Sequence, residues 1–269
     1  MFHYLYITRS PEVAAFVEQA GVTRLFVDLE IHGKVDRQGH LNTVISRHTM
    51  EDVTRVKSVL GVADLLVRLN PLHPGSRQEV DDAIEAGADI IMQPMFHTVE
   101  EVAEFGRYID GRVRFMPLVE TASALNQIGS ISALNCVDEI HIGLNDLHLD
   151  LGLEFMFEPV ASGLIEQSIE TVSKPFGFGG VARVGQGDVP GELVMAEHVR
   201  LGSTGVILSR AFHAGADTVE ALNDGFSFRE ELKKLMSERE TLLSMDTDSL
   251  NAKHLEFQAG VKKILSKKL

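Results

Sequence analysis

Short apolar runs alternate with amphipathic stretches from the N-terminus to about residue 212. The runs are rich in β-branched and aromatic residues, as buried strands are, and the stretches between them show the three-to-four-residue apolar spacing of helices. This pattern predicts strands at residues 4–8, 24–30, 64–70, 89–95, 114–120, 138–144, 175–180 and 205–212. A regular alternation of strands and helices indicates βαβ units around a parallel sheet.

Eight repeats of strand and helix favour a closed barrel, so we predict an α/β fold of the TIM (β/α)8 type. The alternative is an open doubly wound sheet, which usually carries a glycine-rich turn after its first strand. The chain instead reads RSPEVAAF after Thr8. The barrel is therefore the predicted architecture.

After Phe212 the sequence becomes charge-rich and helical, with no further strand pattern. We predict a barrel domain over residues 1–235 and a helical extension over residues 236–269. A barrel needs only one helix after its last strand. The extension is therefore expected to pack on the outside of the barrel, to pack on a neighbouring subunit, or to fray.

Composition narrows the class of protein. The 269 residues are 44% hydrophobic, which suffices for one large core. The net charge of −14 disfavours nucleic acid and anionic membranes as partners. No run approaches the roughly 18 apolar residues of a membrane span, and the single cysteine, Cys136, cannot form an internal disulfide. We expect a cytoplasmic protein that binds neither nucleic acid nor membranes.

Polar residues at the ends of the predicted strands are the candidates for chemistry, because barrel active sites lie where the strands end. Asp28 and Glu30 end the second strand, Arg68 the third and Glu120 the fifth, and Asp146 follows the sixth. Asp28 and Glu30 share one face of their strand, since side chains alternate sides. They could orient water around a metal or bind Arg68.

Glu120 and Asp146 end neighbouring strands about 4.8 Å apart, so their carboxylates can reach one ion. Carboxylates without a nearby cysteine favour a hard divalent metal, Mg or Mn. The carboxylate and keto oxygens of a 2-oxo acid could chelate such an ion, which would then stabilise an enolate at the next carbon. The sequence therefore predicts a metal site that activates a small 2-oxo acid.

Several strings together resemble the HpcH/HpaI aldolase and citrate lyase β-subunit superfamily. The resemblance covers roughly residues 24–212 and rests on LFVDLE (25–30), LLVRLNP (65–71), EAGADIIMQPM (85–95), PLVETASAL (117–125) and HIGLNDLHLDLG (141–152). It implies that Glu120 and Asp146 bind the metal and that Arg68 contacts the keto oxygen of the substrate. It also implies that backbone amides at Asn145 and Asp146 hold the substrate carboxylate.

One family position differs. The aldolase branch carries a histidine directly after the acid of the second strand, where this chain has Ile31. His32 follows one residue later and is our candidate for the catalytic acid–base residue. His48 and a metal-bound water are the alternatives.

The leading functional prediction is a class II aldolase that joins or cleaves pyruvate, or a similar 2-oxo acid, and an aldehyde. No predicted strand ends in the lysine that a Schiff-base mechanism needs. Leu118 stands where aldolases often have glutamine, which favours the alternative of a citrate-lyase-like or malyl-CoA-lyase-like acyl-thioester lyase. Such an enzyme would need a basic lip for the CoA phosphates, and only Arg37, Arg47 and Arg77 are scattered candidates.

A further alternative is a binding protein that keeps the barrel and the acid pair without turnover. The extra helices and the resemblance together predict a homo-oligomer.

Overall fold

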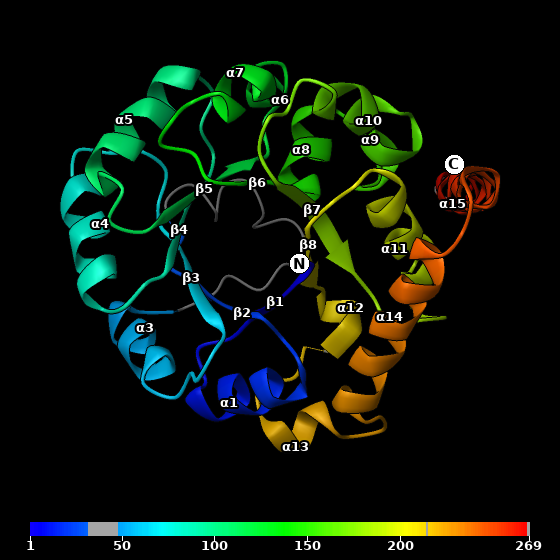
Figure 1. Cartoon of the computed structure of the whole chain (residues 1–269), viewed down its shortest axis with the longest axis horizontal. Helices are drawn as coiled ribbons and strands as arrows, with labels where there is room; N and C mark the ends of the chain where they lie inside the picture. The colour runs from blue at the N-terminus through cyan, green and yellow to red at the C-terminus, as the bar shows by residue number, and fades with distance from the viewer. Residues whose placement is uncertain (32–47, 214, 268–269) are drawn as a thin grey trace.

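Eight parallel strands close into a barrel in chain order, each hydrogen-bonded to the next and β8 to β1 (Figure 1). The computed structural model describes residues 1–31, 48–213 and 215–267. The strands are β1 (His3–Ile7), β2 (Arg24–Asp28), β3 (Asp64–Arg68), β4 (Ile90–Gln93), β5 (Arg114–Val119), β6 (Ile140–Ile142), β7 (Phe176–Val181) and β8 (Gly205–Leu208). The predicted TIM barrel is confirmed, and every strand except β7 ends earlier than its sequence pattern suggested.

Helices surround the barrel (Figure 1). The longer ones are α1 (Pro11–Ala20), α3 (Met50–Lys57), α4 (Ser76–Glu85), α5 (Val99–Ile109), α11 (Gly191–Arg200), α14 (Phe228–Leu243) and α15 (Thr247–Leu265). The shorter ones are α6 (Ala122–Leu125), α7 (Ile128–Ser132), α8 (Leu144–Asp150), α9 (Glu158–Ala161), α10 (Leu164–Ile169), α12 (Arg210–His213) and α13 (Val219–Leu222).

Local sequence explains where several helices begin. The Ser10 side chain accepts the Val13 N–H and Pro11 takes the first helical position of α1. Thr49 and Thr98 open α3 and α5 in reciprocal capping boxes with the acidic residue three positions on. These caps lie at the C-terminal end of the barrel, because each helix follows its strand there.

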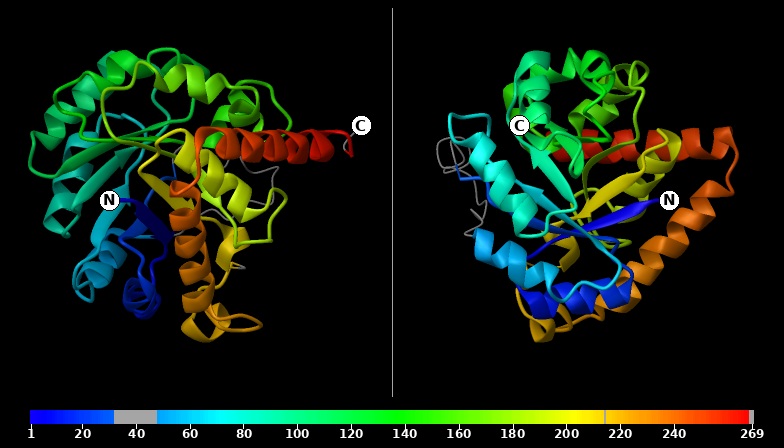
Figure 2. Two further views of the ribbon diagram at one scale, coloured as in Figure 1. Left: turned by 45° about the vertical axis from the view of Figure 1, so that its right-hand side comes forward. Right: turned by 60° about the vertical axis from the view of Figure 1, so that its left-hand side comes forward.

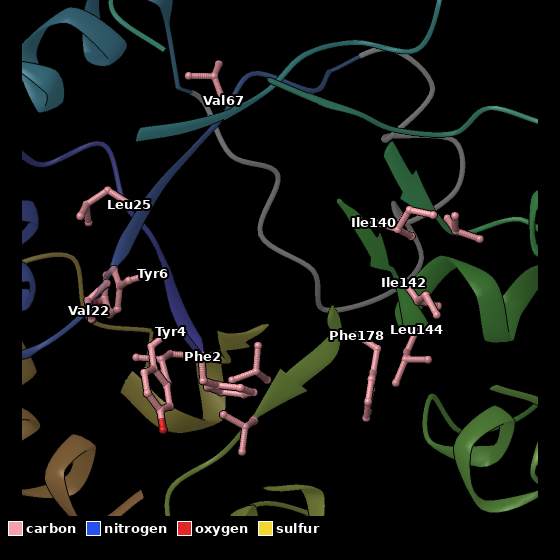
Figure 3. Packing of buried hydrophobic residues seen from close by; sticks show 14 of the residues in the cluster. Phe2, Tyr4, Tyr6, Val22, Leu25, Val67, Ile140, Ile142, Leu144 and Phe178 are labelled. Carbon is pink, nitrogen blue, oxygen red and sulfur yellow. The ribbon is translucent and has the colours of Figure 1, made fainter. Parts of the chain in front are cut away.

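The barrel sheet carries apolar side chains on both of its faces, one layer inside the barrel and one outside it. The inner layer contains Leu5, Phe26, Leu66, Ile90, Met92, Met116 and Leu118. The outer layer packs the strands against the helices, and Figure 3 shows part of it around Tyr4, Tyr6, Val67 and Ile142. Because side chains alternate along a strand, Asp28 and Arg68 share the inward side with Phe26 and Leu66.

The C-terminal helices pack on the same chain. Helix α14 packs against α1 and α11, and α15 lies outside α11 and α9 (Figure 2). The Phe257 ring on α15 is buried edge-on against Phe157, with ring centroids 5.8 Å apart, and His254 lies 2.9 Å from Glu197 on α11. The expectation of packing on the outside of the barrel is met. Residue 235 falls within α14, and the division into two domains stays a prediction.

Across the described ranges, none of the helices is both long and apolar enough to span a bilayer.

Candidate active site

An ion pair joins the ends of β2 and β3 inside the barrel mouth. The Nε and Nη2 atoms of Arg68 donate to the two carboxylate oxygens of Asp28, at 2.8 and 2.9 Å. Nη2 also lies 3.4 Å from the Glu30 carboxylate. Both acids are buried, and the guanidinium carbon lies 5.5 Å from the centre of the Phe26 ring. The arginine is therefore held on its carboxylate side and on its apolar side.

Arg68 remains positively charged. Burial is the largest influence and lowers its pKa, but the carboxylates of Asp28, Glu30 and Glu120 together outweigh burial and raise the pKa above its ordinary value. The guanidinium is a permanent cation among buried acids.

Glu120 follows β5 and is buried, with 3% of its surface exposed. Its Oε1 accepts the N–H of Met95 at 3.0 Å, and Met95 adopts a positive φ of 47° to present that group. A side chain at Gly143 would place its Cβ 2.9 Å from the Oε2 of Glu120. The glycine after β6 therefore makes room for this carboxylate.

The pKa of Glu120 depends on its burial and on the charged groups around it. Burial raises the pKa of Glu120 to about 8; Arg68 opposes this effect, and the carboxylates of Asp146 and Glu30 add to it. These influences show that the acids lie close together. A cation at this point would relieve their mutual repulsion.

Asn145 and Asp146 occupy the first turn of α8, directly after β6 and Gly143. The side chain of Asp146 is buried, and Asn145 is exposed. Backbone N–H groups in a first turn have no partner within their helix. The turn thus brings both a carboxylate and backbone donors to the barrel mouth.

The donor set fits a hard cation. In the described ranges, no group of three or more His, Cys, Asp or Glu side chains is arranged as a metal site. Two carboxylates, Glu120 and Asp146, suit an oxygen-preferring divalent ion that takes its other ligands from substrate and water. The fit is to Mg or Mn rather than to zinc, which favours nitrogen and sulfur ligands.

Asn70 links the ends of β2 and β3 outside the ion pair. Its Oδ1 accepts the N–H of Ile31 at 2.9 Å, and its side-chain amide donates to Glu79 on α4. Asn70 is the last residue of the strand predicted over residues 64–70. Its role in holding the backbone beside Glu30 is visible only in three dimensions.

His48 lies at the same end of β2. Its Nδ1 accepts the N–H of Asp28 at 3.0 Å. This N–H points toward the β1 side, because the carbonyl of Phe26, two residues earlier, accepts the Thr8 N–H there. His48 thus occupies the place where β1 would continue. His32, our predicted acid–base residue, lies outside the described residues.

The sequence did not single out His141 as a residue inside the barrel. It lies on β6 between two outward-facing isoleucines, so it points inward, and its Nε2 is 3.3 Å from the Gly179 carbonyl oxygen. Burial lowers the pKa of His141 to about 4. It is therefore a neutral interior residue that donates to a backbone carbonyl.

A cavity of about 500 Å³ opens at the other end of the barrel, beside Asp64, Arg114 and Asp138. Its charges pair with one another: Arg114 contacts Asp64 at 2.6 Å, and the neighbouring buried Arg24 contacts Glu139 at 2.7 Å. These groups lie where strands begin, at the end of a barrel that serves stability. The chemistry-bearing residues lie at the opposite end, so the cavity does not mark the active site.

The fold is a (β/α)8 barrel that gathers buried acids and an arginine at the end where barrel enzymes carry their active sites. Residues 9–184 match the family model described as HpcH/HpaI aldolase/citrate lyase. The chain belongs to this family, whose members are aldolases and lyases. None of the curated proteins matches the sequence.

Solved structures share the fold at low sequence identity. An HpcH/HpaI aldolase/citrate lyase family protein from Burkholderia cenocepacia J2315 is 17% identical, with a TM-score of 0.59 over 77% of this chain and 87% of that one. The HpcH/HpaI aldolase from Desulfitobacterium hafniense DCB-2 is 15% identical, with a TM-score of 0.57 over 91% and 94%. RipC from Yersinia pestis is 15% identical, with a TM-score of 0.57 over 93% and 98%.

Proposed function

We propose that the chain is a metal-dependent carbon–carbon lyase, a class II aldolase that joins or cleaves pyruvate, or a similar 2-oxo acid, and an aldehyde. The observation that carries the proposal is the partly buried Arg68, paired with Asp28 and surrounded by Glu30 and Glu120, at the mouth of a barrel of this family. A fixed cation beside a carboxylate pair suits a reaction in which a keto oxygen gains charge.

Glu120 and Asp146 would hold the divalent metal, Mg or Mn. Once bound, the ion would act as a Lewis acid on the carboxylate and keto oxygens of the 2-oxo acid. Gly143 supports this role, since it leaves the Oε2 of Glu120 uncovered by a neighbouring side chain. The backbone amides of Asn145 and Asp146 would bind the substrate carboxylate.

Arg68 would donate a hydrogen bond to the keto oxygen. When the carbon next to the keto group loses a proton, negative charge moves onto that oxygen and the hydrogen bond strengthens. Asp28 and Glu30 would keep the guanidinium in place during this change. The contribution of Arg68 is therefore to the transition state more than to substrate binding.

His32 remains our candidate for the group that moves the proton. The geometry of His48 supports a different role, because its Nδ1 is occupied as an acceptor for the Asp28 N–H. A ring whose Nδ1 accepts a hydrogen bond carries its proton on Nε2. We therefore propose that His48 positions Asp28, and through Asp28 positions Arg68.

We also propose a homo-oligomer in the cytoplasm. Helices α14 and α15 add outer surface beyond the single closing helix that a barrel requires, which supports subunit contacts there. Light scattering at micromolar concentration tests this part, and a monomeric mass would overturn it.

The reaction is tested by incubating the protein with pyruvate, Mg or Mn, and a panel of aldehydes, followed by mass spectrometry. We expect 4-hydroxy-2-oxo acids, whose mass is the sum of the two reactants. Cleavage of an acyl thioester without any aldol product would instead support the citrate-lyase-like or malyl-CoA-lyase-like alternative. Metal binding without either reaction would support a non-catalytic binding protein.

A further inference from the structure

The turn that follows β4 adopts a backbone conformation that side chains rarely allow. Met95 has a φ of 47°, and within the described ranges Asp110 is the one other non-glycine residue with a positive φ. Such a residue stores strain, which persists only where the surroundings hold the chain in place. Asp110 ends α5 at its C-cap, where left-handed residues are common. Met95 ends no helix, so its conformation needs another explanation.

The strained residue directs its N–H at Glu120. This N–H donates to Oε1 at 3.0 Å, whereas Oε2 lies on the side of Gly143. Gly143 is the N-cap of α8, whose first turn carries Asp146. Strand β5 lies between β4 and β6 in the barrel. The amide therefore binds the carboxylate from the β4 side and leaves Oε2 on the β6 side, from which Asp146 comes.

Three hydrogen bonds fasten this turn to the segment that follows β5. The Thr121 hydroxyl donates to the Phe96 carbonyl at 2.9 Å, and the Gln127 side-chain amide donates to the His97 carbonyl at 2.9 Å. The third joins the His97 ring and the Ser123 hydroxyl, 3.2 Å apart. The segment that holds the strained turn is thus the one that begins directly after Glu120.

Thr121 makes the buried bond of this set. Its side chain is fully buried, and its hydroxyl also accepts the Ala124 N–H as the N-cap of α6. A hydroxyl has one proton to donate and lone pairs to accept with, so it serves both bonds at once. The Phe96 carbonyl would lose its side-chain donor if the hydroxyl were removed, and an unpaired buried carbonyl is costly.

We propose that Thr121 is a positioning residue for the metal site. It holds the strained Met95 amide through the Phe96 carbonyl, and this amide aims Oε2 of Glu120 toward the cation. This role rests on the proposed function, which takes Glu120 and Asp146 as the metal ligands. Loss of a group that orients a metal ligand typically costs about 10–100-fold in metal affinity.

The first experiment compares two substitutions of Thr121 by calorimetric titration with Mn. Thr121→Val keeps the shape of the side chain and removes the donor, whereas Thr121→Ser keeps the hydroxyl. We expect Thr121→Val to weaken Mn binding at least about tenfold and Thr121→Ser to stay within about threefold of the unmodified protein. The matched control is Thr204→Val, because the Thr204 hydroxyl donates to the Phe176 carbonyl at 3.0 Å just before β8, at the other end of the barrel. This control should bind Mn as the unmodified protein does.

Substitution of Met95 tests the backbone conformation itself. Asparagine tolerates a positive φ, whereas a β-branched valine does not. We expect Met95→Asn to bind Mn within about threefold of the unmodified protein and Met95→Val to bind it at least about tenfold more weakly. Asp110→Val creates the same conflict at the exposed end of α5 and should leave Mn affinity unchanged.

Hydrogen exchange of the Met95 N–H needs no metal and tests the first link alone. An amide held in a hydrogen bond exchanges only when the local structure opens. We expect this amide to exchange at least about tenfold faster in Thr121→Val than in Thr121→Ser or the unmodified protein. Urea unfolding of the same variants measures any loss of overall stability separately.

Thr121→Val that binds Mn as tightly as the unmodified protein overturns the inference, even if it unfolds at lower urea concentration, because Thr121 then serves stability only. Unchanged exchange of the Met95 amide in this variant overturns it as well. If Thr121→Val does not fold, equal Mn affinity in Met95→Val and Met95→Asn has the same meaning. In each of these cases, Mn binding that Glu120→Gln weakens leaves the proposed metal site standing. No saturable Mn binding by the unmodified protein would instead overturn the metal site, and this inference with it.

Discussion

The guanidinium of Arg68 and the carboxylate of Asp28 form two parallel hydrogen bonds, at 2.8 Å from Nε and 2.9 Å from Nη2. The fork of an arginine matches both oxygens of a carboxylate, which a lysine ammonium cannot do. Because Asp28 is buried, the pair fixes the orientation of Arg68 rather than only its charge.

Replacing Arg68 with lysine therefore tests geometry at constant charge. We expect Arg68→Lys to lower turnover by roughly 10²-fold, on the scale of losing one oxyanion donor, with metal affinity nearly unchanged. Steady-state kinetics and metal titration on this variant check the expectation, with Arg107→Lys at an exposed position as the control. A loss below about threefold would reduce Arg68 to the neutralising role of an ordinary surface ion pair.

Substitution of Gly143 tests whether metal binding needs the open space beside Glu120. The backbone of Gly143, with φ −86° and ψ 90°, is open to alanine, but the added Cβ would lie 2.9 Å from Oε2 and 3.0 Å from the Cβ of Glu120. We expect Gly143→Ala to displace the carboxylate and to weaken metal binding by about tenfold or more, the scale seen when groups that orient metal ligands are lost.

Isothermal titration with Mn measures this effect. The control is Gly260→Ala on α15, where an added Cβ meets no atom within 4 Å. Equal metal affinity in the two variants would show that the space at Gly143 is not needed for metal binding.

Substitution of His48 tests whether its hydrogen bond to the backbone of Asp28 supports the ion pair between Asp28 and Arg68. Removing the acceptor of the Asp28 N–H leaves a backbone donor without its partner, which costs about 1–3 kcal/mol when the group is buried. We expect His48→Ala to lower kcat by about tenfold with little change in KM, since 1.4 kcal/mol corresponds to tenfold. His48→Gln offers a side-chain oxygen as acceptor and should recover most of the loss. A glutamine variant as poor as the alanine variant would instead assign proton transfer to His48.

Stability should fall in mild acid. Burial lowers the pKa of His141 to about 4 in the folded chain, below its ordinary value of 6.5. Between pH 6.5 and pH 4, His141 is therefore protonated in the unfolded state but neutral in the folded state. The free energy of unfolding is highest above pH 6.5 and decreases as the pH falls toward 4. At pH 5 this one group should account for about 2 kcal/mol.

Urea unfolding of the protein and of His141→Gln, at pH 7.5 and pH 5, measures that contribution. Glutamine keeps a donor for the Gly179 carbonyl, so its free energy of unfolding should depend less on pH. His97→Gln, at an exposed position, serves as the control. The same pH dependence in all three proteins would exclude His141 as the source.

The barrel was predictable because its signal is repeated. Each strand is an apolar run bounded by polar sequence, and the outward and inward layers follow from strict alternation. The strands were predicted too long because the residues after β2, β3 and β5, Glu30 and Glu120 among them, continue the sequence pattern beyond the last residue of each strand. The same feature let the strand-end rule select the residues that the structure gathers at the mouth.

The sequence could not predict which groups come close together across neighbouring strands. The fit of Gly143 against Glu120, the positive φ of Met95 and the inward His141 depend on neighbouring strands, and no local pattern encodes them. A basic lip was sought at Arg37, Arg47 and Arg77. The first two lie outside the described residues, and Arg77 is exposed on α4.

Proton NMR of pyruvate in deuterated water measures metal-dependent enolate formation by this protein, because loss of the methyl signal reports the enolate without any knowledge of the acceptor. We predict exchange with Mg or Mn present, none after exhaustive treatment with EDTA, and recovery when Mg, Mn or Co is added back. We also predict that Glu120→Gln exchanges at least about 10²-fold more slowly at saturating metal. Undiminished exchange after exhaustive chelation, or in Glu120→Gln, would contradict a metal-dependent enolate formed at this site.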